Sequence, residues 1–270
     1  MAGTHLLVGA GKMGGALLSG WIDSGLVTPR KLVILDPNPG PQAVFAIERG
    51  AKHITTAQEI PASVRTVILA IKPQMFERLG AELGASLSTK AVILSILAGT
   101  SLRTLQAAFD ERHVIRAMPN TPASIGAGVS AIFADPALTE DILGDAEALL
   151  KPGGDVVYVD SEAELNAVTA ISGSGPAYVF HLVEALEVGA LDLGLPKDVA
   201  AKLARETIIG AAKLLEATDD GPDVLRKNVT SPNGTTQAAL DVLMGEDGGL
   251  SKMMIATVRA AFARAKELAG

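Results

Sequence analysis

The sequence predicts an α/β fold, with a doubly wound parallel sheet in the N-terminal part and a C-terminal part that is entirely helical. Short β-branched runs alternate with helical stretches over the first 160 residues. A glycine-rich turn follows the first of these runs, and the strand signal ends near Asp160. Strands and helices that alternate at this spacing indicate βαβ units and a parallel sheet.

The expected strands are short, and several are apolar without alternation. Continuous apolar runs are typical of parallel strands that are covered on both faces. Helical segments lie between them, such as residues 14–25 and a segment that opens at Pro73, which can occupy a first helical turn. The expected strands are "HLLVG" (5–9), "KLVILD" (31–36), "TVILAI" (66–71), "AVILSI" (91–96), "VIRAM" (114–118) and "VVYV" (156–159).

A change from strands to helices places the domain boundary near residue 161. "SEAELNAVTAI" begins a helix with Ser161 as its N-cap and Glu164 three residues later, which is a capping-box pattern. From there to Gly270 the pattern is helical, with interruptions by glycine, proline and asparagine turns. We expect a sheet domain over residues 1–161 and a helical domain over residues 162–270.

The composition indicates a globular chain. Its 270 residues are 48% hydrophobic and 20% charged, enough for one large domain or two ordinary ones. The net charge of −7 argues against a nucleic-acid partner, because such proteins present a basic face. The lack of cysteine excludes disulfides and a cysteine zinc site, and we expect no metal. Without a secretory signal or a transmembrane run, a cytoplasmic protein with no membrane partner is expected.

The first strand is followed by Gly9-x-Gly11-x-x-Gly14, which then opens a helix. In this context Gly9 permits a tight turn, Gly11 lets the backbone approach a pyrophosphate, and Gly14 allows close helix–strand packing. The N-terminus of the helix offers free N–H groups to phosphates. The alternative is a glycine-rich turn that only packs against its sheet. Because strand, glycines, helix and second strand follow in order, dinucleotide binding is favoured.

The second strand ends in Asp36, which bears on the choice between NADH and NADPH. An acidic residue at this place hydrogen-bonds the ribose hydroxyls of NAD and repels a 2′-phosphate. The alternative is a solvated aspartate at a turn. No arginine follows it directly, although Asn38 could donate to a phosphate. NADH is therefore favoured over NADPH.

Three further segments lie at the carboxyl ends of expected strands, where open α/β sheets bind ligands. Lys72 on its own fits a solvated lysine at a helix start. Ala98 and Gly99 are small enough for a nicotinamide or ribose to lie against the backbone. Asn120 in "MPNTP" could contact the ligand or cap the turn, and the sequence does not separate these roles.

Two interruptions of the helical half each have two interpretations. "SGSGP" (172–176) is either a helix kink or a place where a ligand or partner backbone approaches closely. "NVTSPNGTT" (228–236) is either a loop whose threonines cap the next helix or an anion cradle. From the residues alone, capping is the simpler explanation for Thr235 and Thr236.

These motifs together resemble pyrroline-5-carboxylate reductase, the last enzyme of proline synthesis. The resemblance rests on "GAGKMG", "AIKP", "MPNTP", "ISGSGPAYVF" and "NVTSPNGTT" in the same order, and it covers essentially the whole chain. It implies a Rossmann domain, an all-helical dimerisation domain and a substrate site at the dimer interface. It also implies a homo-oligomer, either a dimer or a decamer of five dimers.

The resemblance assigns site residues by position. Thr236 matches the threonine that hydrogen-bonds the ring nitrogen of the substrate and is the catalytic candidate. The place of a cofactor-contacting asparagine is taken by Ala57, which puts one side-chain contact in doubt. The implied substrate-site residues are Glu162, Asn228, Ser231, Gly234, Thr235 and Thr236. The implied cofactor residues are Gly9, Ala10, Gly11, Lys12, Met13, Gly14, Asp36, Asn38, Ala70, Ile71, Lys72, Pro73, Ile96, Leu97 and Ala98.

The implied chemistry is hydride transfer from NADH or NADPH to the C=N carbon of a cyclic imine, for which the protein supplies placement and electrostatics. The histidines lie outside the site motifs, as expected if the imine arrives protonated. A β-hydroxyacid dehydrogenase is the nearest rival, but its catalytic lysine would fall at about Val179. A non-catalytic dinucleotide sensor is the other rival, and it would need no substrate cradle.

Overall fold

The structure is a computed structural model that describes residues 3–110, 112–135 and 137–269. It divides into two compact units. Unit 1 holds the described residues up to Ser174 together with those from Ala261 onward, and unit 2 runs from Gly175 to Ala260. Each unit is described separately below.

Unit 1 is built around a sheet of eight strands within the described residues. The first six strands in the chain are parallel, β7 runs antiparallel to β6, and β8 runs parallel to β7. The spatial order is β3-β2-β1-β4-β5-β6-β7-β8. The strands are β1 (Thr4–Val8), β2 (Leu32–Leu35), β3 (Lys52–Ile54), β4 (Val64–Leu69), β5 (Val92–Ser95), β6 (Val114–Met118), β7 (Gly128–Ala134) and β8 (Gly154–Tyr158).

The mostly parallel sheet confirms the predicted α/β class, and three of its strands differ from the expectation. Strand β3 was not expected, because its three residues are too few to show a pattern. Strand β7 was not expected either, and it runs against its neighbour β6. The expected strand 156–159 corresponds to β8, which follows the direction of β7 and lies at the sheet edge, so it is not part of the parallel series.

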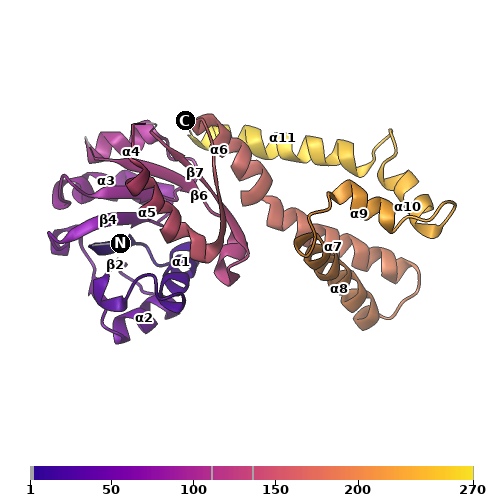
Figure 1. The fold of residues 1–270 in the computed structure, drawn as a ribbon, viewed down its shortest axis with the longest axis horizontal. Coiled ribbons are helices and arrows are strands. Elements are labelled where there is room, and N and C mark those ends of the chain that lie inside the picture. The colour runs from indigo at the N-terminus through magenta and orange to yellow at the C-terminus, as the bar shows by residue number, and fades with distance from the viewer. Residues whose placement is uncertain (1–2, 111, 136, 270) are drawn as a thin grey trace. The chain divides into compact units, whose positions relative to one another are not determined.

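Helices lie on both sides of this sheet (Figure 1). One hydrophobic core includes side chains of α1, α2 and α5, and a second includes side chains of α3 and α4. Pro73 occupies the first turn of α3, as predicted. The helices of unit 1 are α1 (Lys12–Asp23), α2 (Pro41–Glu48), α3 (Pro73–Ser86), α4 (Leu102–Phe109), α5 (Glu140–Leu150) and α6 (Glu162–Val168), followed by a π-helical turn at Thr169–Gly173.

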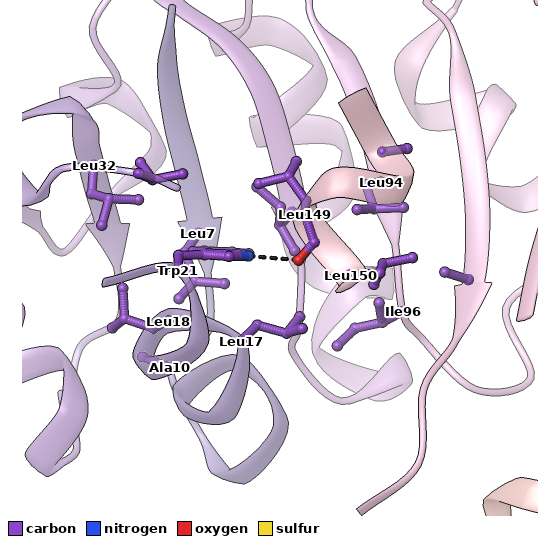
Figure 2. Packing of buried hydrophobic residues seen from close by; sticks show 14 of the residues in the cluster. Leu7, Ala10, Leu17, Leu18, Trp21, Leu32, Leu94, Ile96, Leu149 and Leu150 are labelled. Carbon is purple, nitrogen blue, oxygen red and sulfur yellow. Dashed lines mark hydrogen bonds between the residues drawn. The ribbon is translucent and has the colours of Figure 1, made fainter. Parts of the chain in front are cut away.

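Trp21 anchors the first of these cores. Its indole is fully buried among Leu7, Leu18 and Leu32, and its Nε1–H donates to the carbonyl oxygen of Leu149 at 2.6 Å (Figure 2). A buried indole N–H needs such a partner, because an unsatisfied donor in a core is costly. This bond ties α1, which carries the glycine turn, to α5.

The strand order reverses beside β1, which lies between β2 and β4. The chain therefore leaves β1 on one side and later returns on the other, which is the doubly wound arrangement. Open sheets of this kind bind ligands outside the carboxyl ends of their strands at such a switch point. The turn after β1 and the ends of β2 and β4 are thus the first place to look for a site.

Helix α6 packs with the sheet unit, although the sequence pattern placed it in the helical half. Leu165 and Ala170 are buried, and Glu162 forms an ion pair with Arg116 of β6. The sequence predicts a boundary near residue 161, where the strand pattern ends. In the structure, the segment up to Ser174 belongs to unit 1. Whether residues 162–270 act as one domain stays a prediction.

The predicted capping box at the start of α6 is formed only in part. Ser161 donates its hydroxyl to Glu164 at 2.9 Å, and the backbone N–H of Asp160 donates to the same carboxylate at 3.1 Å. The Ser161 side chain itself makes no capping bond within the described structure. A complete capping box is found instead between Thr56 and Glu59, in the short turn after β3.

Unit 2 consists of helices with almost no core of their own. Helices α7 and α8 pack against one another, and the buried side chains of α8 are the small residues Ala200 and Ala204. Among the described residues, α7, α9 and α10 bury no side chain. The helices are α7 (Gly175–Asp192), α8 (Lys197–Glu216), α9 (Pro222–Asn228), α10 (Thr235–Leu243) and α11 (Leu250–Ala269), whose last residues belong to unit 1.

Across the described residues, no helix is both long and apolar enough to cross a membrane. The same residues contain no cluster of three or more histidine, aspartate or glutamate side chains that could hold a metal ion.

Candidate active site

The glycine turn after β1 has three glycines with different structural demands. Gly9 has φ +87°, and an added Cβ would lie 2.6 Å from Cγ2 of Ile71. At Gly14 an added Cβ would lie 2.1 Å from the carbonyl oxygen of Gly9, so α1 crosses the turn in direct contact. At Gly11 an added Cβ would meet no described atom within 4 Å. The fold requires glycine at the first and last positions, whereas Gly11 faces open space.

That open space is a cavity of about 600 Å³ at the switch point of the sheet. It lies between the ends of β1, β2 and β4 on one side and helix α3 on the other. Its wall combines apolar side chains with a few polar and charged groups, as small-molecule sites do. The lining residues are Val8, Gly9, Gly11, Leu35, Asp36, Pro37, Asn38, Thr55, Ala70, Ile71, Lys72, Met75, Arg78, Leu79 and Glu82.

Asp36 lies in this wall with both carboxylate oxygens hydrogen-bonded to backbone. Oδ2 accepts from the N–H of Ala10 at 2.7 Å, and Oδ1 accepts from the N–H of Asn38 at 2.8 Å. Its own carbonyl oxygen lies 2.8 Å from Nε2 of His53. The carboxylate is therefore held in place by the glycine turn and by the turn that follows β2, and it is not simply solvated.

One face of α3 forms the opposite wall, and the sequence analysis missed it. Met75, Arg78, Leu79 and Glu82 line the cavity at intervals of three and four residues, the spacing of one helical face. A helical pattern anchored at Pro73 could have found this face. Arg78 makes no ion pair with any described residue. Although no arginine follows Asp36 in sequence, the fold brings one into the same cavity.

Thr55 also lines the cavity and was missed. The Glu59 carboxylate accepts from the backbone N–H groups and hydroxyls of Thr55 and Thr56, at 2.9–3.4 Å. The hydrogen bond from the Thr55 N–H, followed by those from Thr56, lowers the pKa of Glu59. Ala57, the position flagged by the resemblance, is fully buried.

The other implied cofactor residues have diverse surroundings. Lys72 precedes α3 and lines the cavity, while Pro73 opens that helix. Lys12 and Met13 lie in the first turn of α1, and Met13 packs against the core. In the loop after β5, Ile96 and Leu97 are buried and Ala98 is exposed. These last three do not line the cavity.

Asn120 precedes the short helix Thr121–Ile125, and its side chain makes no capping bond to that helix within the described structure. Its side-chain Oδ1 accepts from the N–H of Val129 at 2.9 Å, and Nδ2 donates to the carbonyl oxygen of Ser172 at 3.2 Å. Both ends of the amide are thus used within unit 1. The π-helical turn that contains Ser172 is a local change of helix type at the start of "SGSGP", and an added Cβ at Gly173 would lie 3.1 Å from Cε of Met118, whereas one at Gly175 would meet no described atom within 4 Å.

Five of the six implied substrate residues lie in the turn between α9 and α10 or in the adjoining helix ends. Asn228 ends α9, and Ser231 accepts a backbone hydrogen bond from Gly234 at 3.0 Å. Asn233 has φ +58°, so the turn is sharp and leads directly into α10. Thr235 and Thr236 are the first two residues of this helix, which begins after Gly234.

The simpler explanation for these threonines, helix capping, is wrong. Gly234 is the N-cap of α10, and within the described structure no side chain makes a capping bond there. An uncapped helix start leaves backbone N–H groups and hydroxyls available to an anion. The anion cradle, the other interpretation of this turn, stays a prediction.

Glu162, the sixth implied substrate residue, lies in unit 1. Its Oε1 accepts a hydrogen bond from Nη1 of Arg116 at 2.7 Å and another from the backbone N–H of Leu102. Arg116 was not singled out from the sequence, because nothing in its strand indicates a partner 46 residues away.

Comparisons with known proteins support this description. Residues 162–268 match the family model described as pyrroline-5-carboxylate reductase dimerisation. Residues 6–99 match the model described as NADP oxidoreductase, coenzyme F420-dependent. The first unit thus contains an NAD(P)-binding domain, as the glycine turn predicts.

Full-length relatives agree with these matches. A pyrroline-5-carboxylate reductase of Synechocystis sp. is 38% identical over 263 residues, covering 97% of each chain. The structure of a pyrroline-5-carboxylate reductase from Coxiella burnetii is 32% identical, with a TM-score of 0.91 and full coverage of both chains. A third similar protein is a Plasmodium falciparum pyrroline carboxylate reductase, whose structure has NADP bound. It is 22% identical, with a TM-score of 0.84 over 99% of this chain and 98% of that chain, and this likeness shows the fold.

Proposed function

The chain belongs to the pyrroline-5-carboxylate reductase family, and from that premise we propose how its residues carry out the reaction. It reduces 1-pyrroline-5-carboxylate to L-proline with NADH or NADPH. Our assignment of the cofactor site rests on the cavity beside Gly11. The packing of the chain does not require glycine at this position, because an added Cβ would meet no described atom within 4 Å.

The cofactor would lie along the carboxyl ends of the strands. The turn from Gly9 to Gly14 and the start of α1 hold the pyrophosphate, because the backbone can approach closely at Gly11 and α1 presents its N-terminal N–H groups. The adenosine end lies between Asp36 and the α3 face of Met75 and Leu79. Ile96, Leu97 and Ala98 form the wall toward the nicotinamide, with the exposed Ala98 as the contact surface.

We propose NADH as the preferred reductant. The carboxylate of Asp36 is fixed in the cavity wall by two backbone N–H groups, so a 2′-phosphate would meet a negative charge there. NADPH is the alternative, and Arg78 favours it, since this cation lines the same cavity without an ion-pair partner among the described residues. The balance between these two charges decides the preference.

The substrate would bind at the turn before α10. Its carboxylate would accept hydrogen bonds from backbone N–H groups between Ser231 and Thr236, where no side chain caps the helix in the described structure. Thr236 would hydrogen-bond the ring nitrogen and orient the C=N bond. We assign Asn228 and Thr235 supporting contacts in the same turn, as the resemblance implies. For Glu162, the resemblance is the sole basis for an assignment to the substrate site.

The reaction joins one hydride and one proton to the C=N bond. A reduced nicotinamide held at this site would supply the hydride to the ring carbon and become oxidised, while the ring nitrogen would keep the proton of the protonated imine. Because that imine is already electrophilic, the residues at the turn need to bind and orient it and do not need to donate a proton. The site residues accordingly include no histidine, and the turn offers hydroxyl and N–H groups instead.

The helical unit makes the protein a homo-oligomer, and we propose that the basic assembly is an obligate dimer. Residues of α7 such as Phe180 and Val188 are 64% and 65% exposed, and no described side chain of this helix is buried. Apolar helices with so little burial need a second copy to cover them. A decamer of five dimers, which the resemblance implies, is the larger assembly proposed.

A spectrophotometric assay tests this function. Purified protein is mixed with 1-pyrroline-5-carboxylate and either NADH or NADPH, and oxidation of the cofactor is followed together with formation of proline. Turnover in this assay with none on β-hydroxyacids is the expected result. Cofactor binding without turnover of the imine would contradict our assignment and favour a non-catalytic sensor.

A further inference from the structure

Glu162 links three separate segments of unit 1. It begins α6, its Oε1 accepts from Nη1 of Arg116 on β6 at 2.7 Å, and the same oxygen accepts from the backbone N–H of Leu102, the first residue of α4. The side chain of Arg116 is only 8% exposed. A nearly buried arginine needs its partner, because removing one member of such a pair leaves an uncompensated charge.

The segment that this contact holds is the loop between β5 and α4. Its beginning is fixed to the sheet, because Ile96 donates its N–H to the carbonyl oxygen of Leu69 at 3.0 Å, and Leu97 donates to Oγ of Ser95 at 3.4 Å. Its end is fixed by Glu162 at Leu102. Arg116 pairs with Ser95 in the sheet, so the ion pair lies beside the start of the same loop.

Between these fixed ends lies the part of the loop assigned to the nicotinamide. Gly99 has φ +71° and leaves no room for a side chain, since an added Cβ would lie 2.9 Å from the carbonyl oxygen of Leu268. Thr100 is buried, while Ala98 is exposed. The loop therefore has a defined shape, which the contact at Glu162 helps to set.

We propose that Arg116 is a positioning residue for hydride transfer. Through Glu162 and the N–H of Leu102 it holds the loop from Ile96 to Ser101 in the conformation that places Ala98 against the nicotinamide. This rests on the proposed placement of the cofactor. Arg116 acts through its partner and touches neither the cofactor nor the substrate. In this arrangement the Glu162 carboxylate, which the resemblance assigns to the substrate site, also sets the geometry of the loop.

The chain offers a matched control in Arg112. This arginine has a side chain that is 6% exposed, precedes the amino end of β6, and donates to the carbonyl oxygens of Gly84, Leu87 and Phe109 at 2.7–2.9 Å. Removing it costs buried hydrogen bonds, as removing Arg116 does, yet it lies before the strand and has no contact with Glu162. Arg112→Met therefore separates general loss of stability from loss of loop geometry.

The experiment compares Arg116→Met, Arg116→Lys, Glu162→Gln, Arg112→Met and the double variant Arg116→Met/Glu162→Gln. Hydrogen exchange of residues 96–102 is measured without ligand, together with the Kd for each reduced cofactor, kcat, and both KM values. In Arg116→Met we expect faster exchange, weaker cofactor binding and a kcat lower by about tenfold or more, because small misplacements of a reacting group are costly. Arg116→Lys should recover part of each change.

The other three variants keep the test decisive even if Arg116→Met folds poorly. Glu162→Gln keeps the size of the side chain and should show the same changes more weakly. The double variant should be little worse than Arg116→Met alone, because residues that act as a unit are non-additive. Arg112→Met should lower the melting temperature with kcat and the cofactor Kd unchanged.

Three outcomes would overturn the proposal in distinguishable ways. Unchanged exchange and kinetics in Arg116→Met would reject the positioning role and leave the proposed function intact. Faster exchange with unchanged cofactor binding and kcat would show that the loop does not serve the cofactor, which would reject its proposed placement as well. Additive effects, with Glu162→Gln raising only the KM for the imine, would show that Glu162 acts on the substrate and not through the loop.

Discussion

The carboxylate of Asp36 accepts a hydrogen bond from the backbone N–H of Ala10 at 2.7 Å, so the end of β2 holds the turn that follows β1. The two residues lie 26 positions apart and meet only because β1 and β2 are neighbours in the sheet. A negative charge is thereby fixed where the adenosine ribose of a bound cofactor is expected. We expect both the strength of cofactor binding and the choice between NADH and NADPH to depend on this contact.

Asp36→Ser should raise the ratio of kcat/KM for NADPH to that for NADH by about fivefold, the effect of removing about 1 kcal/mol of like-charge repulsion. The KM for both cofactors should also rise, because Ala10 loses its partner. Asp36→Asn is the matched control, because it removes the negative charge of the side chain and keeps its size and shape. Kinetics with both cofactors at fixed ionic strength check this.

A strong preference for NADPH in the wild type that persists in Asp36→Ser would contradict this assignment. If the same preference disappeared in Arg78→Met, the cation on α3 would be the deciding group.

Gly11→Ala and Gly14→Ala should have opposite consequences. At Gly11 an added methyl meets no described atom within 4 Å, so the variant should fold with nearly the wild-type melting temperature and bind the cofactor at least about tenfold more weakly. At Gly14 the methyl would lie 2.1 Å from the carbonyl oxygen of Gly9, so the free energy of unfolding should fall. Thermal unfolding and cofactor titration separate the two. Normal cofactor binding by Gly11→Ala would refute the site.

Thr236→Ala should raise the KM for the imine or lower kcat, because one hydrogen bond to the substrate ring is lost. A loss of about 1–2 kcal/mol corresponds to a decrease in kcat/KM of about 5- to 30-fold. Thr139→Ala is the control, since Thr139 lies directly before the first residue of α5 and its side chain makes no capping bond with described residues. Steady-state kinetics with the imine as the varied substrate provide the measurement. Wild-type values for Thr236→Ala would remove this residue from the site.

The stability of the fold should decrease in mild acid because of His5. Its side chain is buried, its Nδ1 has no partner among the described residues, and burial lowers its pKa from 6.5, with nearby Asp145 acting in the opposite direction. The unfolded chain therefore binds a proton more readily than the folded one. The stabilisation is complete above pH 6.5 and is lost as the pH falls toward the folded-state pKa.

His5→Leu should remove this contribution. Urea unfolding at several pH values should show a shallower loss of the free energy of unfolding than in the wild type as the pH falls below 6.5. An identical slope in both proteins would show that His5 is not the group responsible.

Phe180→Asp should disrupt the assembly and with it the activity. The side chain is 64% exposed on a helix that buries no described side chain, so a carboxylate there would be placed in the proposed dimer interface. Ile125→Asp, at a position that is 80% exposed in unit 1, is the control and should keep the wild-type mass. Light scattering at micromolar concentration gives the result. A wild-type protein that is monomeric and active would rule out the obligate dimer.

Much of unit 1 follows from local sequence. Gly9 and Gly14 identify the turn after β1 because a positive φ and a close helix crossing can be accommodated only by glycine. Continuous apolar runs identified the parallel strands at the centre of the sheet, where both faces are covered. The strand end at Asp36 and the helix start at Pro73 are likewise local signals. The resemblance of the motifs then identified the family.

What the tertiary structure decided depends on residues far apart in sequence. Arg78 enters the cavity because α3 packs beside β2 and β4, and Arg116 meets Glu162 because α6 packs against β6. Strand β7 runs against β6 through pairing that no local pattern encodes. Backbone preferences act between near neighbours, so they predict turns, strands and helices. Charge partners and strand direction depend on long-range packing, which only the folded chain determines.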